Sequence, residues 1–132
     1  MLRSVLAVLG GMVAAGVAMM GLEWVGREIL PPPPGMDLGD PVAMASLTQD
    51  LPLEMLLTLL FAWALATLIG ALAACFIAGE HPLVNSILIG LIVSAVTAVN
   101  LARFPHPGWF SISAYVLIAC SALLAGRISS AR

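Results

Sequence analysis

Residues 51–79 of the chain read LPLEMLLTLLFAWALATLIGALAACFIAG. No charged residue follows Glu54 within it, and the apolar run is longer than the roughly 20 residues that a helix needs to cross a bilayer. Pro52 is tolerated in the first turn of a helix, and Thr48 or Asp50 can cap its N-terminus. The stretch therefore predicts a membrane-spanning helix.

Three further apolar runs surround this helix, at residues 4–30, 82–103 and 107–127. Of the 132 residues, 61% are hydrophobic and 9% are charged, whereas soluble domains are about one quarter charged. The sequence thus predicts an all-α, polytopic membrane protein: a four-transmembrane-helix bundle forming one membrane domain over residues 1–132, with the lipid bilayer as its surroundings. The first run is longer than a signal-peptide core and is expected to remain as a signal-anchor.

The connection between the first two spans, residues 31–50, differs in character from the rest of the chain. It begins with four prolines at 31–34, which end the first span and predict a stiff polyproline rod. A turn is expected at Gly35. Asp40 followed by Pro41 is a strong helix start, so the loop should end in a short interfacial helix over residues 41–47.

The arginines indicate how the chain is oriented. Four spans place both termini on one side of the membrane, together with Arg3, Arg127 and Arg132, while Arg27 and Arg103 fall on the other side. Arginine bias toward the cytoplasm then places both termini inside. The expected location is a bacterial inner, or cytoplasmic, membrane.

Aromatic residues support these boundaries. Four of them fall near the outer ends of spans, where aromatic rings gather at the level of the lipid headgroups: Trp24, Phe104, Trp109 and Phe110. Trp63 is different, because it lies well inside the second span. It is expected either to pack in the core or to face lipid.

Small residues recur at every fourth position on three spans. Residues four apart share one helix face, and small faces let helix backbones approach closely in lipid. We expect these faces to pack within the chain, although an interface between chains has the same pattern. The positions are Gly10 and Ala14, with Gly11 and Ala15 alongside, in the first span, Ala66, Gly70 and Ala74 in the second, and Gly90 and Ser94 in the third.

Polar residues gather near the outer ends of the spans. They form a candidate outer polar cluster of Glu23, Arg27, Glu54, Asn100, Arg103 and His106. One interpretation is a vestibule that recognises a headgroup or a small ligand. The favoured one is that these residues anchor helix ends at the interface.

The sequence offers no candidate catalytic, cofactor-binding or metal-binding residues. His81 and His106 are predicted on opposite sides of the membrane. Cys75 and Cys120 form no CxxC pair and are expected to be small, buried, apolar residues. The small multidrug resistance transporters are four-span chains of this size, but they depend on a carboxylate in the first span. Residues 5–22 contain none, so that similarity is one of size alone. The chain has no basic stripe, which argues against a nucleic-acid partner.

Four segments of the chain carry a resemblance to other proteins. They are PPPPGMDLGDP at 31–41, LPLE at 51–54, WALATLIGALAACFIAG at 63–79 and NLARFPHPGWF at 100–110, the last containing His106, Pro107, Trp109 and Phe110. With these segments the chain resembles a widespread group of uncharacterised small bacterial four-span inner-membrane proteins, and the resemblance covers nearly the whole chain. It implies the four-span fold and carries no known activity.

These features favour a non-enzymatic membrane protein that acts by packing. The expected role is an accessory or assembly subunit of a larger inner-membrane complex, or a homo-oligomer, so the partner is another membrane protein or a second copy. The alternative is a small transporter or channel whose pathway forms only on oligomerisation. An enzyme is the least favoured reading.

Overall fold

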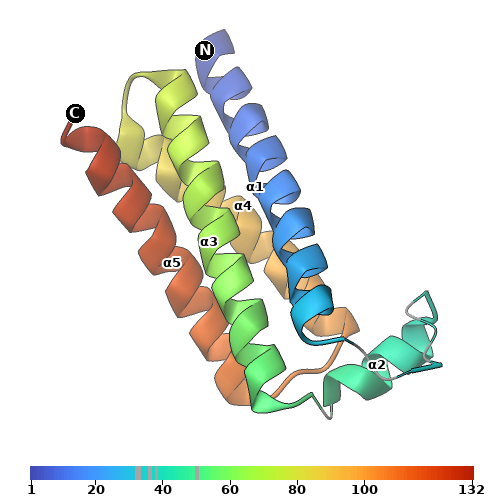
Figure 1. The fold of residues 1–132 in the computed structure, drawn as a ribbon. Coiled ribbons are helices and arrows are strands. Elements are labelled where there is room, and N and C mark those ends of the chain that lie inside the picture. The colour runs from blue at the N-terminus through green and yellow to red at the C-terminus, as the bar shows by residue number, and fades with distance from the viewer. Residues whose placement is uncertain (32–33, 36, 38, 50) are drawn as a thin grey trace.

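The computed structural model describes residues 1–31, 34–35, 37, 39–49 and 51–132. Helices make up most of this part of the chain (Figure 1): α1 is Leu2–Ile29, α2 is Pro41–Gln49, α3 is Leu53–Ala78, α4 is Pro82–Arg103 and α5 is Gly108–Ser130. All but the short α2 are long and apolar enough to cross a membrane. The predicted all-α, four-span fold is therefore confirmed.

The four long helices run alternately up and down, so that both termini lie at one end of the bundle (Figure 1). We call this the terminal end, and the opposite end, where α2 lies, the α2 end. Helix α3 is central and packs against α1, α4 and α5, while α1 packs mainly on α3. In the most apolar 18-residue segment of each helix, 50% of the residues of α3 are buried, compared with 17% of those of α1. The first span is thus the most peripheral.

Proline, glycine and capping residues set most of the helix boundaries. Asp40 caps α2 as predicted, because its carboxylate Oδ1 accepts a hydrogen bond of 3.0 Å from the backbone N–H of Val42. Gly35 has a φ of 84°, which is the left-handed turn that glycine permits. The polyproline rod falls partly outside the described residues, because 32–33 do.

Of the two capping residues predicted for α3, the structure excludes Thr48. The N-cap position is Pro52, and no side chain among the described residues caps the helix there. Thr48 cannot serve because α2 continues to Gln49, so Thr48 is helical rather than in the extended conformation of an N-cap. Asp50 lies outside the described residues.

A tight turn joins α3 to α4. Gly79 ends α3 in the left-handed conformation, with a φ of 70°, and His81 also has a positive φ, of 48°. The buried side chain of Asn85 donates from Nδ2 to the backbone oxygens of Glu80 and His81, at 2.8 and 3.0 Å. The Asn85 side chain therefore satisfies the carbonyl of Glu80 and adds a second bond to the carbonyl of His81, which also accepts the backbone N–H of Asn85 at 3.1 Å.

The small-residue faces of α1 and α3 pack directly against each other. A Cβ atom added at Gly70 would lie 2.6 Å from Cβ of Ala15 and 2.7 Å from the backbone oxygen of Gly11. On α3, Ala66 and Ala74 are buried beside it. These faces thus close within a single chain.

On α1, the residues that contact α3 each lie one position after Gly10 and Ala14, which are the first pair that the four-residue spacing indicated. Gly11 and Ala15 are buried against α3, whereas Gly10 and Ala14 are only partly buried. Gly10 faces the side chain of Ile77. The two sets of small residues on α1 are adjacent in sequence and equally spaced, so spacing alone does not show which set faces α3.

On α4 only part of the predicted small-residue face packs on a neighbouring helix. A Cβ atom at Gly90 would lie 2.8 Å from Cβ of Ala122 on α5. Ser94 is partly buried and Ala98 is exposed. Farther along α4 the buried position is Thr97.

The core has two parts of different composition. Toward the terminal end it is made largely of small residues, with Ala71, Ala74, Ile89 and Ala125. Toward the α2 end it is made of large ones, Leu56, Leu60, Trp63 and Phe110, with Ala114. Small side chains bring helix backbones together and large ones hold them apart.

Candidate binding site

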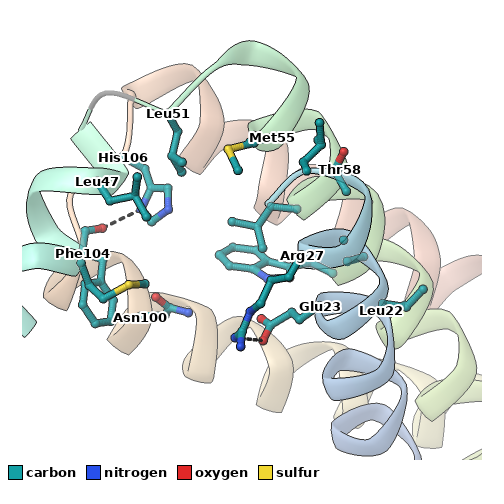
Figure 2. Close-up of a pocket in the computed structure, with 16 residues that line it drawn as sticks. Leu22, Glu23, Arg27, Leu47, Leu51, Met55, Thr58, Asn100, Phe104 and His106 are labelled. Atoms are coloured by element: carbon teal, nitrogen blue, oxygen red, sulfur yellow. Dashed lines mark hydrogen bonds and ion pairs between the residues drawn. The ribbon is translucent and has the colours of Figure 1, made fainter. Parts of the chain in front are cut away.

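A cavity of about 290 Å³ lies at the α2 end of the bundle (Figure 2). It is bounded by α1, α2, α3, the end of α4 and the segment that leads to α5. Most of its wall is apolar, including Leu22, Leu47, Met55 and Trp63. Its volume is near the lower end of the range for small-molecule sites.

The polar part of the wall contains four of the six residues of the predicted outer polar cluster: Glu23, Arg27, Asn100 and His106. In Figure 2, Glu23 and Arg27 lie on one side of the cavity, with Asn100 and His106 across from them. The structure therefore brings together side chains from α1, α4 and the following loop. Their common depth in the bundle was predicted. Their convergence on one cavity matches the vestibule interpretation rather than the favoured one, in which they only anchor helix ends.

The other two predicted residues do not join this group. Glu54 and Arg103 are exposed at the same end of the bundle and do not line the cavity. Glu54 directly precedes the cavity-lining Met55, and consecutive residues of a helix point about 100° apart. For Glu54 and Arg103 the interpretation as exposed helix-end residues fits the structure.

Glu23 and Arg27 form an ion pair across one turn of α1, as their spacing predicted. The distance from Nη2 of Arg27 to Oε2 of Glu23 is 3.9 Å, and both side chains are substantially exposed. A long, exposed pair contributes little to stability. The guanidinium retains donors, and the carboxylate retains acceptor sites, for another polar group.

His106 is fixed by a hydrogen bond and by stacking. Its Nδ1–H donates to the backbone oxygen of Phe104 at 2.6 Å, and its ring stacks on Phe110 with centroids 4.6 Å apart. Burial lowers the pKa of His106, against the opposing effect of the Phe104 bond. In the neutral ring Nε2 is therefore an acceptor, and it faces the cavity (Figure 2).

The aromatic residues near this end do not all behave as predicted. Trp24 and Trp109 are exposed, as expected for rings at the headgroup level, and Phe104 is partly buried. Phe110, however, is 0% exposed. The interfacial anchor predicted there is wrong, because the first turn of α5 aims Phe110 inward and Trp109 outward.

Trp63 is a core residue. It is buried, and it contacts Phe110 edge to face with centroids 5.4 Å apart. Together Trp63, His106 and Phe110 form an aromatic cluster that supports the cavity wall. Sequence reasoning missed this cluster, because its members come from α3, a loop and α5.

A second cavity, of about 180 Å³, adjoins the first. The two share Glu23, Trp63 and Asn100 in their linings. The second one continues between α1 and α4 and is lined there by apolar and small residues such as Met12, Gly16 and Val96. A polar mouth thus leads to an apolar groove.

Hydroxyl and thiol groups within the bundle make hydrogen bonds to backbone oxygens. Thr58 and Thr67 donate to the backbone oxygens of Glu54 and Trp63 on their own helix, at 2.8 and 2.7 Å, as expected for hydroxyls in spans. The buried thiol of Cys75 lies 3.2 Å from the backbone oxygen of Pro82. Cys120 is exposed, which corrects the expectation that both cysteines are buried.

Within the part of the chain that the structure describes, no cluster of three or more His, Cys, Asp or Glu residues could hold a metal ion. Comparison of the chain with family models, with curated proteins and with solved structures found no match. What the site can do follows from its residues. It places hydrogen-bond donors and acceptors of both charges at the mouth of an apolar space, an arrangement suited to an amphipathic molecule.

Proposed function

We propose that this chain is a non-enzymatic membrane protein that acts by binding, as an accessory or assembly subunit of a larger complex in a bacterial inner membrane or as a homo-oligomer. Both termini lie in the cytoplasm in this proposal. The four apolar helices support a membrane location, and the distribution of arginines supports the orientation. The observation that carries the role is the position of α2.

Helix α2 projects sideways from the α2 end of the bundle (Figure 1). Among the residues that the structure describes, none of the four spans packs closely along α2. One face of α2 carries Met44 and Leu47, which line the cavity. Val42 is 74% exposed. In this proposal α2, which extends beyond the bundle, offers Val42 to a neighbouring protein at the membrane surface.

A photo-reactive amino acid at position 42 tests this proposal in native membranes. We expect one discrete adduct, with another membrane protein for an accessory subunit or with a second copy for a homo-oligomer. The same partner should co-purify at a fixed ratio. Val42→Asp should lower that ratio at least tenfold, because it places a charge in the contact.

Position 112 is the matched control. Ile112 on α5 is 69% exposed, similar to Val42, but lies on the surface of a span rather than on α2. A photo-reactive residue there should give no discrete adduct. Equal labelling at both positions, or no adduct at position 42, would contradict the proposal.

The second candidate is a small transporter or channel that forms on oligomerisation. It is favoured by the four polar residues that line one cavity, which could form the mouth of a pathway. The close packing of Gly70 against Gly11 and Ala15 opposes a pathway through a single chain. Ion flux through purified protein in liposomes would support this candidate, and tight liposomes would reject it.

A further inference from the structure

The cavity at the α2 end and the groove between α1 and α4 have the form of a site for one lipid molecule. The groove is lined by both Met12 and Glu23 of α1. At 1.5 Å per residue these positions are about 16 Å apart along the helix axis. This distance is close to half of the roughly 30 Å hydrocarbon core, which is the depth of one lipid leaflet.

The walls of the groove suit an acyl chain. Met12, Met19, Val93 and Val96 give it apolar sides. A Cβ atom at Gly16 would have no neighbour within 4 Å, so the groove has free space at that level. Flexible methionine side chains adapt to an irregular apolar ligand.

The polar mouth determines which headgroup fits. Arg27 offers cationic donors on one side of the cavity. Glu23 offers an anionic acceptor beside it, and Nε2 of the neutral His106 offers a second acceptor across the cavity. Asn100, which can both donate and accept, lines both the cavity and the groove.

An anionic phosphoglycerol headgroup has hydroxyl donors for Glu23 but no cationic group, so nothing offsets the repulsion between its net charge and the carboxylate. A quaternary ammonium has no N–H with which to bond to Glu23 or His106. A headgroup with an anionic phosphate and a primary ammonium satisfies both halves through charge-assisted hydrogen bonds.

We propose that the cavity and groove bind one phospholipid whose zwitterionic headgroup carries a primary ammonium, with its phosphate at Arg27, its ammonium at Glu23, and one acyl chain between α1 and α4. This site is independent of the protein partner proposed for α2.

The test is a lipid titration of the purified full chain in a mild detergent, followed by thermal unfolding and native mass spectrometry. Three phospholipids with identical dioleoyl chains are compared: phosphatidylethanolamine, phosphatidylcholine and phosphatidylglycerol. We expect one phosphatidylethanolamine per chain, bound at least tenfold more tightly than the other two, since a hydrogen bond to a charged group is worth about tenfold or more in affinity.

The chain provides matched variants for the headgroup. Glu23→Gln should abolish the tenfold preference. Arg27→Gln should instead weaken all three lipids, because each of them carries the phosphate that Arg27 binds, and both residues are exposed enough for the fold to tolerate the change. Glu54→Gln and Arg103→Gln make the same charge changes at the same end of the bundle but outside the cavity. These two should leave both the affinities and the preference unchanged.

A third variant tests the groove. Gly16→Leu should fill it and weaken all three lipids by a similar factor, without changing the order among them. Equal binding of the three lipids by the unmodified chain, tighter binding of phosphatidylglycerol, or an unchanged preference in Glu23→Gln would overturn the proposal. Binding lost equally in Glu54→Gln and Glu23→Gln would also overturn it.

Discussion

Gly70 determines how closely two membrane spans approach. Replacing glycine by alanine in an exposed part of a helix is favourable by up to about 1 kcal/mol, because glycine loses more backbone entropy on folding. At Gly70 the new methyl group would meet Ala15 and the backbone oxygen of Gly11 at less than 3 Å. Overpacking of this kind costs about 1–3 kcal/mol.

Gly70→Ala should therefore lower the free energy of unfolding of the detergent-solubilised bundle by about 1–3 kcal/mol, and Gly70→Leu should lower it further. Gly21 is the control, because a Cβ atom there would have no neighbour within 4 Å. Gly21→Ala should be neutral or stabilising. The two curves are measured by thermal or denaturant unfolding, and equal effects at both glycines would contradict the packing described.

His106 makes a prediction for pH. Its pKa is lowered by burial, so the folded chain takes up a proton there less readily than the unfolded chain, in which the pKa of histidine is about 6.5. The contribution of the neutral His106 ring to the free energy of unfolding is complete above about pH 6.5. It is lost as the pH falls toward the pKa of His106 in the folded chain. The melting temperature of His106→Gln should fall less than that of the unmodified chain between pH 7.5 and 5.5. Parallel falls would show that His106 does not titrate in this way.

Helix boundaries are the level at which the sequence is most informative. Pro82 and Arg103 bound α4 as predicted, because proline begins a helix well and arginine favours its carboxyl end. Asp40 and Pro41 likewise mark the start of α2. Side-chain direction is harder to predict. At the start of α5, Trp109 and Phe110 are equally plausible as buried or exposed until the neighbouring helices are placed.

Asp40→Ala tests the start of α2. The substitution removes the bond from the N–H of Val42, and losing an N-cap costs about 0.5–2 kcal/mol of helix stability. Because α2 packs along none of the spans, the effect should stay local. Backbone amides of α2 should exchange hydrogen faster while those of α3 are unchanged. An unaltered exchange rate in α2 would show that the cap does not hold this helix.

For the whole molecule, length and hydropathy were enough to predict the four-span fold. The cavity was not predictable from sequence, because it forms where α1 and α4 fail to pack closely and where residues from separate elements meet. The spacing of Glu23 and Arg27 revealed their ion pair. It could not show that Asn100 and His106 face the same space while Glu54 and Arg103 do not.

The orientation in the membrane is testable by cysteine labelling. In a background with Cys75→Ala and Cys120→Ala, single cysteines are placed by Ser130→Cys at the terminal end and Asp37→Cys in the loop. A membrane-impermeant thiol reagent added to intact cells should label position 37 and not position 130, since the terminal end carries Arg3, Arg127 and Arg132 and is expected inside. The reverse pattern would contradict the proposed orientation.

We propose that this bundle works as a binding protein, with a lipid site in its α2 end and a protein contact through α2. Native mass spectrometry of the chain purified from its own membranes in a mild detergent tests both parts at once. We expect a fixed ratio of the chain to another subunit or to itself, with one phospholipid carrying a primary ammonium retained per chain. A bare single chain, with neither partner nor retained lipid, would contradict it.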